Sequence, residues 1–89
     1  MAIVTFASSI LQHVPAPAGE FPGSTVRAVL EQTFALQPRL RSYVLDDQGA
    51  LRHHLAVFVD GMQIDDPRTQ SDPVGPKSRI HVVQALSGG

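Results

Sequence analysis

The chain has 89 residues, which is enough for one domain with a modest hydrophobic core. Apolar residues make up 43% and charged residues 17%, proportions that exclude a disordered chain. The net charge of -1 gives no indication of a basic surface for nucleic acid, and the lack of cysteine excludes disulfides and a thiol nucleophile.

The N-terminal segment, MAIVTFASSILQH, has no basic leader of the kind that begins a secretory signal peptide. No apolar run in the chain approaches the length of a membrane span. We therefore expect a cytoplasmic protein that contacts neither a membrane nor nucleic acid.

The first predicted element is a strand over residues 2–8, AIVTFAS, which is rich in β-branched and aromatic residues. Val4 and Phe6 would share one face of this strand. The next stretch, residues 13–24, is loaded with proline and glycine. Because proline has no N–H group for a sheet ladder, any strand in this stretch should be short and at a sheet edge.

Helical spacing begins in residues 24–36. Apolar side chains recur there at intervals of three and four, at Val26, Val29, Leu30 and Phe34. We expect Ser24 to be the N-cap and the proline after the segment to end or kink the helix. A second, shorter helix is predicted over residues 38–49, closing at a glycine, with Leu40 and Val44 facing inward.

The segment LAVFVDGMQI predicts a β-hairpin. Residues 55–59 form the first strand, Asp60-Gly61 is a favoured two-residue turn, and the chain returns through residues 62–64. A polar, proline-rich loop then leads to the last predicted strand, RIHVVQAL.

These elements predict an α+β fold in which a mixed sheet packs on one main helix, the β-grasp or ubiquitin-like architecture. The first and last strands should be central in the sheet. The predicted core consists of Val4, Phe6, Val26, Val29, Leu30, Leu55, Val57, Val59, Ile80 and Val82. Phe58 and Val83 would then lie on the uncovered face, which we expect to dock partner proteins.

Four histidines raise the hypothesis of a metal site. His53 and His54 are adjacent, so in a strand their side chains would point to opposite faces. His13 and His81 have no neighbouring ligand at metal-binding spacing. We expect surface histidines and no metal site.

Two acidic pairs, Asp46-Asp47 and Asp65-Asp66, raise the hypothesis of calcium binding or acid–base chemistry. Neither pair fits the alternating acids of a calcium loop. Both flank predicted turns, where an aspartate carboxylate commonly accepts hydrogen bonds from nearby backbone amides. We interpret both pairs as turn residues.

The segment VGPKS resembles a phosphate-binding loop only superficially. Pro76 removes a backbone amide that such a loop needs before Lys77, so we expect a turn into the last strand. Spacing alone assembles no catalytic triad either. The sequence therefore predicts no enzyme active site.

The chain ends on two glycines, Gly88 and Gly89. A free α-carboxylate is a poor electrophile, and it becomes an acyl donor most simply through adenylation by a separate ATP-using enzyme that excludes water. Glycines can thread a narrow slot in such an enzyme because they have no Cβ. The simpler interpretation is a frayed end. We divide the chain into a domain over residues 1–85 and a flexible tail over residues 86–89.

With this ending, the chain resembles the ThiS/MoaD-like ubiquitin-like sulfur carriers, and among them the CysO-type carriers. The similarity covers nearly the whole chain and includes VTF, STVRAVLEQ, PRLRSYVLDDQGALRHHLAVFVDG and the closing ALSGG. The resemblance implies a β-grasp fold and a terminal glycine that an E1-like enzyme adenylates with ATP. Conversion to a thiocarboxylate would follow, and this group would donate sulfide to a biosynthetic acceptor.

The resemblance also implies residue roles. Gly89 would carry the acyl-adenylate and then the thiocarboxylate, Gly88 would thread the slot, and Leu86 would be an apolar anchor. The partners would be the E1-like enzyme and a sulfurtransferase or sulfur-accepting synthase, and the chain itself would be a cosubstrate with no bound cofactor. Related chains often have proline where this chain has Gln84, so the exit of the tail is expected to differ.

Two other functions remain open at this point. The chain could be a protein modifier that is joined to lysine through Gly89, which requires the same activation. It could also be a passive β-grasp interaction module whose terminal glycines are incidental.

Overall fold

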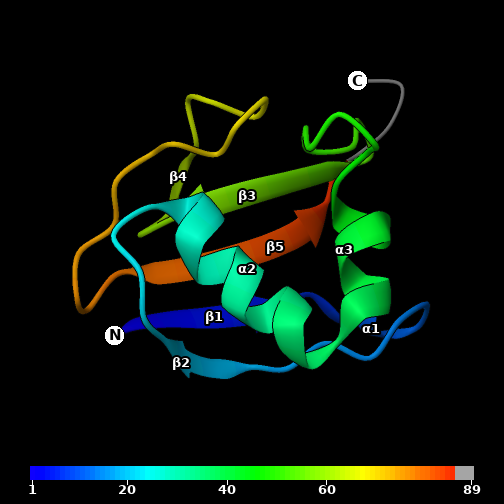
Figure 1. Cartoon of the computed structure of the whole chain (residues 1–89), viewed down its shortest axis with the longest axis horizontal. Coiled ribbons are helices and arrows are strands. Elements are labelled where there is room, and N and C mark those ends of the chain that lie inside the picture. The colour runs from blue at the N-terminus through cyan, green and yellow to red at the C-terminus, as the bar shows by residue number, and fades with distance from the viewer. Residues whose placement is uncertain (86–89) are drawn as a thin grey trace.

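A five-stranded mixed sheet forms the centre of the protein in this computed structural model, which describes residues 1–85 (Figure 1). The strands are β1 (Ala2–Phe6), β2 (Gly19–Phe21), β3 (Leu55–Val59), β4 (Met62–Gln63) and β5 (Arg79–Gln84). Their order across the sheet is β2-β1-β5-β3-β4. The central strands β1 and β5 pair in parallel, and the other neighbours pair antiparallel.

Within the described residues, the helices are α1 (Ser8–Leu11), α2 (Val26–Leu36) and α3 (Pro38–Val44). Figure 1 shows α2 lying across one face of the sheet, with α3 beside it. This arrangement agrees with the predicted mixed sheet on one main helix. None of these helices is long and apolar enough to cross a bilayer.

The N-terminal third largely follows the sequence pattern. Val4 and Phe6 are buried, and Thr5 between them is exposed. The proline-rich stretch forms only the three-residue edge strand β2, as the missing N–H groups require. The prediction did not include α1, because a four-residue helix with one buried residue, Ile10, is too short to show a helical repeat.

The N-cap of α2 is Thr25 and not Ser24, so the prediction was wrong by one residue. Thr25 has an extended backbone, and its side chain accepts a hydrogen bond from the Ala28 amide at 3.1 Å. The Ser24 carbonyl instead accepts a bond from the Val74 amide at 3.0 Å. The predicted apolar stripe of α2 is buried.

The second helix, α3, begins at Pro38 but ends at Val44, five residues before the predicted closing glycine. Leu40 and Val44 are buried, as expected. Gly49 belongs to a separate turn, in which its amide donates to the Asp46 carbonyl and its φ angle is +80°. A glycine with a positive φ angle can end a turn as readily as a helix. The predicted helix was therefore extended too far, to residue 49.

The predicted hairpin is confirmed. Val59 pairs with Met62 across the turn, and the φ angles of Asp60 and Gly61 are 51° and 86°. Two consecutive positive φ angles are what a type I′ turn requires. Strand β4 ends at Gln63, one residue before the predicted end, although the Ile64 amide still donates to the Val57 carbonyl at 3.0 Å.

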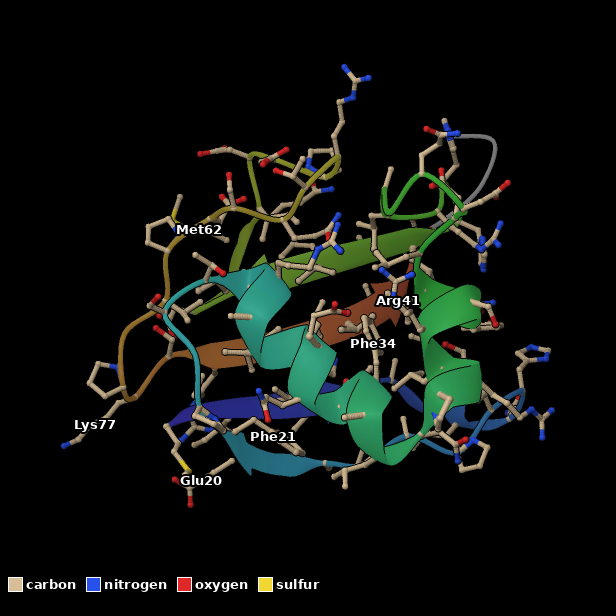
Figure 2. The ribbon with its side chains drawn as sticks, viewed as in Figure 1. Glu20, Phe21, Phe34, Arg41, Met62 and Lys77 are labelled. Carbon is tan, nitrogen blue, oxygen red and sulfur yellow. The ribbon has the colours of Figure 1, made fainter. Side chains whose placement is uncertain are left out.

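The hydrophobic core lies between the helices and one face of the sheet. All residues of the predicted core are buried except Val59, which is partly buried and packs against the others. Figure 2 shows Phe34 reaching from α2 into the layer beside α3, where it is also buried. Val57 pairs with Val82 at the centre of this layer.

Gly23 and Gly19 form a matched pair for testing how tightly α2 is packed. Both have φ angles near +140° (145° and 141°), but a Cβ on Gly23 would lie 2.8 Å from Val29 Cγ2, whereas one on Gly19 would meet no described atom within 4 Å. We expect Gly23→Ala to lower the free energy of unfolding by about 1–3 kcal/mol more than Gly19→Ala. Urea unfolding followed by circular dichroism measures this difference. Equal losses in the two variants would contradict it.

Candidate functional site

The end of β5 is held firmly in the sheet. β5 pairs with β1 on one side and with β3 on the other, and Gln84 still pairs with Leu55. The next residue, Ala85, donates its amide to the His54 carbonyl at 2.8 Å. The described chain therefore ends on a backbone that is fixed to the start of β3.

The predicted tail, with Gly89, Gly88 and Leu86, lies outside the described residues. Their roles in activation and threading therefore stay predictions. What the structure supplies is the position from which the tail departs, which we call the tail root and define as His54 and Ala85.

Phe58 and Val83 lie on the sheet face that points away from the core. Phe58 pairs with His81 and Ala56 pairs with Val83, so strand alternation places all four on the face opposite Val57 and Val82, although Ala56 is itself buried. Both Phe58 and Val83 are partly exposed. On the same face, Thr5 Oγ1 and His81 Nδ1 are hydrogen-bonded at 2.6 Å. Docking of a partner on this face stays a prediction.

The histidines near the tail root belong to an aromatic row that the sequence did not indicate. The His13 ring stacks on Tyr43 with centroids 5.8 Å apart, and Tyr43 meets His54 edge to face at 5.5 Å. The row joins three segments that are distant in sequence, so no local pattern could have predicted it. His53 and His54 lie in a turn before β3. They do not lie in a strand, so the expectation that their side chains point to opposite faces of a sheet does not apply.

No group of three potential ligands in residues 1–85 could hold a metal ion. The two acidic pairs instead organise loops, as predicted. Asp46 Oδ1 accepts hydrogen bonds from the amides of Ala50 and Gln48, at 3.0 and 2.8 Å. These bonds, chiefly the one from Ala50, lower the pKa of the Asp46 carboxyl, with a smaller contribution from the Arg52 charge.

Asp66 holds the following loop in the same way. Its carboxylate accepts bonds from the Ser71 hydroxyl at 2.5 Å, from the Thr69 hydroxyl, and from the amides of both residues. The Ser71 hydroxyl makes the largest contribution to a pKa well below the ordinary value of an aspartate. Asp72 accepts the amides of Asp65 and Asp66 at 2.8 and 3.0 Å. The loop is thus folded around carboxylates.

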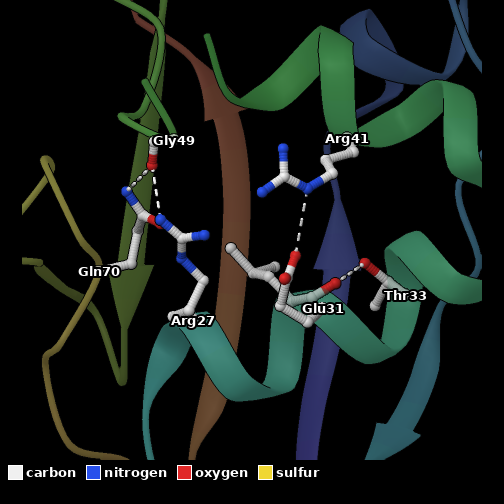
Figure 3. A network of polar contacts seen from close by, with 7 residues as sticks. Arg27, Glu31, Thr33, Arg41, Gly49 and Gln70 are labelled. Carbon is white, nitrogen blue, oxygen red and sulfur yellow. Dashed lines mark hydrogen bonds and ion pairs between the residues drawn. The ribbon is translucent and has the colours of Figure 1, made fainter. Parts of the chain in front are cut away.

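A buried polar network joins this loop to the turn after α3 (Figure 3). The Gly49 carbonyl accepts from Arg27 Nη2 at 2.7 Å and from Gln70 Nε2 at 3.2 Å. Gln70 is fully buried, and its side chain also donates to the Pro67 carbonyl at 2.7 Å. The network fixes both loops to α2. No sequence pattern indicated this network, because arginine and glutamine are ordinary residues on a helix and in a loop.

The VGPKS segment is a turn into β5, as predicted. Gly75 donates its amide to Ser78 Oγ at 2.8 Å, and the Ser78 amide donates to the Gly75 carbonyl at 3.2 Å. Lys77 at the tip is exposed and projects away from the sheet (Figure 2).

The ThiS family model matches residues 13–89. The chain belongs to the ThiS family. No curated protein is similar enough in sequence to count as a relative of this ThiS-family chain.

Two solved structures share the fold of this ThiS-family chain. A chain in the crystal structure of the Amycolatopsis orientalis BexX/CysO complex superposes with a TM-score of 0.80, at 14% identity and over 100% of both chains. SAMP1 from Haloferax volcanii superposes with a TM-score of 0.74, at 19% identity, over 99% of this chain and 98% of that one. The predicted β-grasp, ubiquitin-like fold and the resemblance to the ThiS family are confirmed, and the likeness to the chain of the BexX/CysO complex is one of fold. Family and fold together support a ubiquitin-like sulfur carrier or modifier.

The loop around Asp66 gives a prediction about pH. Because its folded-state pKa is depressed, Asp66 stabilises the fold above the unfolded-state value of about 4, and this contribution is lost as the pH falls below it. We expect Ser71→Ala to raise the pKa of the Asp66 carboxyl and to make the free energy of unfolding less sensitive to acid. Carboxyl NMR titration measures the pKa. Ser24→Ala, which does not touch Asp66, is the control, and an unchanged pKa in Ser71→Ala would contradict the assignment.

Proposed function

We propose that this chain is a sulfur carrier whose terminal Gly89 is adenylated by an E1-like enzyme and then converted to a thiocarboxylate. The observation that carries the proposal is the ThiS-family match, which runs through the Gly-Gly end at residue 89. The β-grasp scaffold supports it, because its last strand is central and leads directly to the tail.

The proposed chemistry takes place on the carboxylate of Gly89. A carboxylate oxygen attacks the α-phosphorus of ATP, and pyrophosphate leaves. Hydrosulfide delivered by a sulfurtransferase then attacks the acyl carbon and expels AMP, and loss of the S–H proton leaves the thiocarboxylate. The thiocarboxylate sulfur finally adds to an electrophilic carbon of the acceptor on a sulfur-accepting synthase, and water cleaves the resulting thioester C–S bond at the acyl carbon, which restores the carboxylate and leaves the sulfur on the acceptor. ATP is consumed by the partner enzyme, and the chain acts as a cosubstrate in the cytoplasm.

The described residues contribute rigidity to this scheme. The amide of Ala85 is bonded to His54, and β5 is paired on both sides, so the tail departs from a defined point. A fixed departure point lowers the conformational freedom that the partner must remove when it encloses the terminus. Gly88 and Leu86 complete the proposal as the slot residue and the apolar anchor.

In the same proposal, the E1-like enzyme docks on the open face around Phe58 and Val83. Both are partly exposed apolar residues on central strands, so their burial would release water from apolar surface close to the middle of the sheet. Phe58 is the larger of the two and is the expected anchor.

Intact mass spectrometry tests the proposed chemistry. After incubation with an E1-like enzyme, ATP and a sulfide source, we expect the chain to gain the mass difference between one sulfur and one oxygen atom. The chain has no cysteine that could take up sulfur elsewhere. Failure of the wild-type chain to gain sulfur with a demonstrably active enzyme would remove the sulfur-carrier proposal, and an isopeptide bond to lysine would identify a modifier.

Variants of the tail locate the reaction. Deleting Gly89 or adding a residue after it should abolish the mass gain, because the reacting carboxylate is then missing or displaced. Gly88→Val should reduce the gain nearly as much, because a β-branched side chain restricts the backbone and obstructs a slot. Thermal unfolding should stay unchanged in all three variants, because the altered residues follow β5, whose sheet pairing ends at Gln84. Lys77→Ala is the control and should gain sulfur normally.

Phe58→Asp tests the docking face. We expect this variant to weaken binding to the E1-like enzyme by about 2 kcal/mol or more, because a charged group replaces a central anchor. Isothermal titration calorimetry measures the affinity. Met62→Asp is a matched control. Met62 is 76% exposed, and its pairing with Val59 places it on the face of the hairpin opposite Phe58. Equal effects of the two substitutions would argue against docking on this face.

A further inference from the structure

An open groove of about 410 Å³ begins beside the tail root. It lies between the segment that precedes β3 and the segment that follows β4. Leu51, Leu55 and Pro67 line it with apolar atoms, and Arg52, His53 and Arg68 line it with basic groups. The groove is on a different part of the molecule from Phe58 and Val83, which do not line it.

The groove is held in shape by backbone hydrogen bonds. The Leu51 amide donates to the Pro67 carbonyl at 2.8 Å, which ties the two walls together. The Leu55 amide donates to the Arg52 carbonyl at 3.0 Å, and Arg52 Nε donates to the Ser42 carbonyl at 2.8 Å. The guanidinium of Arg52 is therefore positioned between α3 and the groove. The buried Gln70 side chain also connects these two walls, because its Nε2 donates to the carbonyls of Gly49 and Pro67.

The charges of the groove favour an anionic occupant. Two arginines and a histidine face a single carboxylate, that of Asp46. This carboxylate already accepts hydrogen bonds from the amides of Gln48 and Ala50, so it is directed at its own turn. A neighbouring hollow of about 540 Å³ has the opposite balance, because Asp46 and Asp66 line it with Arg68 as the one cation among its lining residues. An acidic ligand would therefore prefer the groove with Arg52.

The position of the groove connects it to the tail. His53 lines the groove, and the next residue, His54, binds Ala85 through its carbonyl. The groove therefore begins one residue from the backbone to which Ala85 is bonded, close to where an enzyme would meet the chain in order to enclose the residues after Ala85. A volume of several hundred Å³ accommodates a few side chains of such a surface.

We propose that this groove receives a carboxylate-bearing segment of the enzyme that activates the C-terminus, with Arg52 and Arg68 pairing with its acidic side chains. The methylene groups of the partner's acidic side chains would pack on Leu51 and Leu55, while their carboxylates pair with the guanidinium groups. This inference rests on the proposed function, and it adds a second contact surface beside the open face. Charge pairing at such a rim acts mainly on the rate of association and on partner choice.

A peptide experiment tests the groove without any enzyme. A hexaglutamate peptide is titrated into the ¹⁵N-labelled full-length chain, and amide shifts are followed by NMR. We expect the shifts to gather in residues 50–55 and 63–68, to disappear in Arg68→Glu and to persist in Lys77→Glu. The two variants are matched, because each reverses one exposed cation in a proline-containing loop. Shifts that are spread over the surface, or that survive in Arg68→Glu, would overturn the proposal.

A second experiment uses the E1-like enzyme. Arg68→Glu should reduce its rate of association with the chain by about tenfold at low salt, with a smaller difference at high salt, whereas Lys77→Glu should stay within about twofold. Arg68→Ala should give an intermediate loss, and thermal unfolding verifies that each variant folds. Equal association rates for wild type and Arg68→Glu, with normal adenylation of both, would overturn the proposal that the groove binds the enzyme. The proposed function would be unaffected by that result. Failure of the wild-type chain to be adenylated would instead count against the proposed function. The peptide experiment alone would then test whether the groove binds acidic side chains.

Discussion

The contact between α2 and one face of the sheet determines the rest of the structure. The α2 helix lies across one face of the sheet (Figure 1), and its buried residues are apolar except for Thr33, whose hydroxyl donates to the Leu30 carbonyl at 2.7 Å. Because side chains alternate along a strand, covering one face assigns every strand residue to the core or to the open face. The existence of an open face follows from this one contact.

The two long loops depend on a different kind of interaction. They contain few buried apolar side chains, and carboxylates bonded to backbone amides define their shape. The Gly49 carbonyl, with donors from Arg27 and Gln70, then connects both loops to α2. The molecule therefore combines an apolar layer, which sets the sheet, with a polar region, which sets the surface next to the tail root. A change in the polar region can alter this surface without altering the sheet.

The sequence predicted the apolar part well because its periodicity is local. The alternation in β3 and β5 and the spacing in α2 placed the core correctly, and Asp60-Gly61 identified the hairpin turn. The errors occurred where local signals are ambiguous. Ser24 and Thr25 are both good N-cap residues, and only the backbone geometry decides between them. The aromatic row of His13, Tyr43 and His54 joins distant segments, so it could not be read from any single stretch. The Gly-Gly end and the family match identify the candidate reacting group, but its surroundings depend on a partner.

The parallel pairing of β1 with β5 has a consequence for the synthesis of the protein. The first strand cannot complete its place in the sheet until the last strand, which ends at Gln84, has left the ribosome. Contacts of such large sequence separation form late in folding. A prematurely terminated chain would lack the central strand as well as the terminal glycines. Completion of the sheet therefore waits for the synthesis of β5, and a chain that stops before this strand cannot form the parallel pair at the centre of the fold.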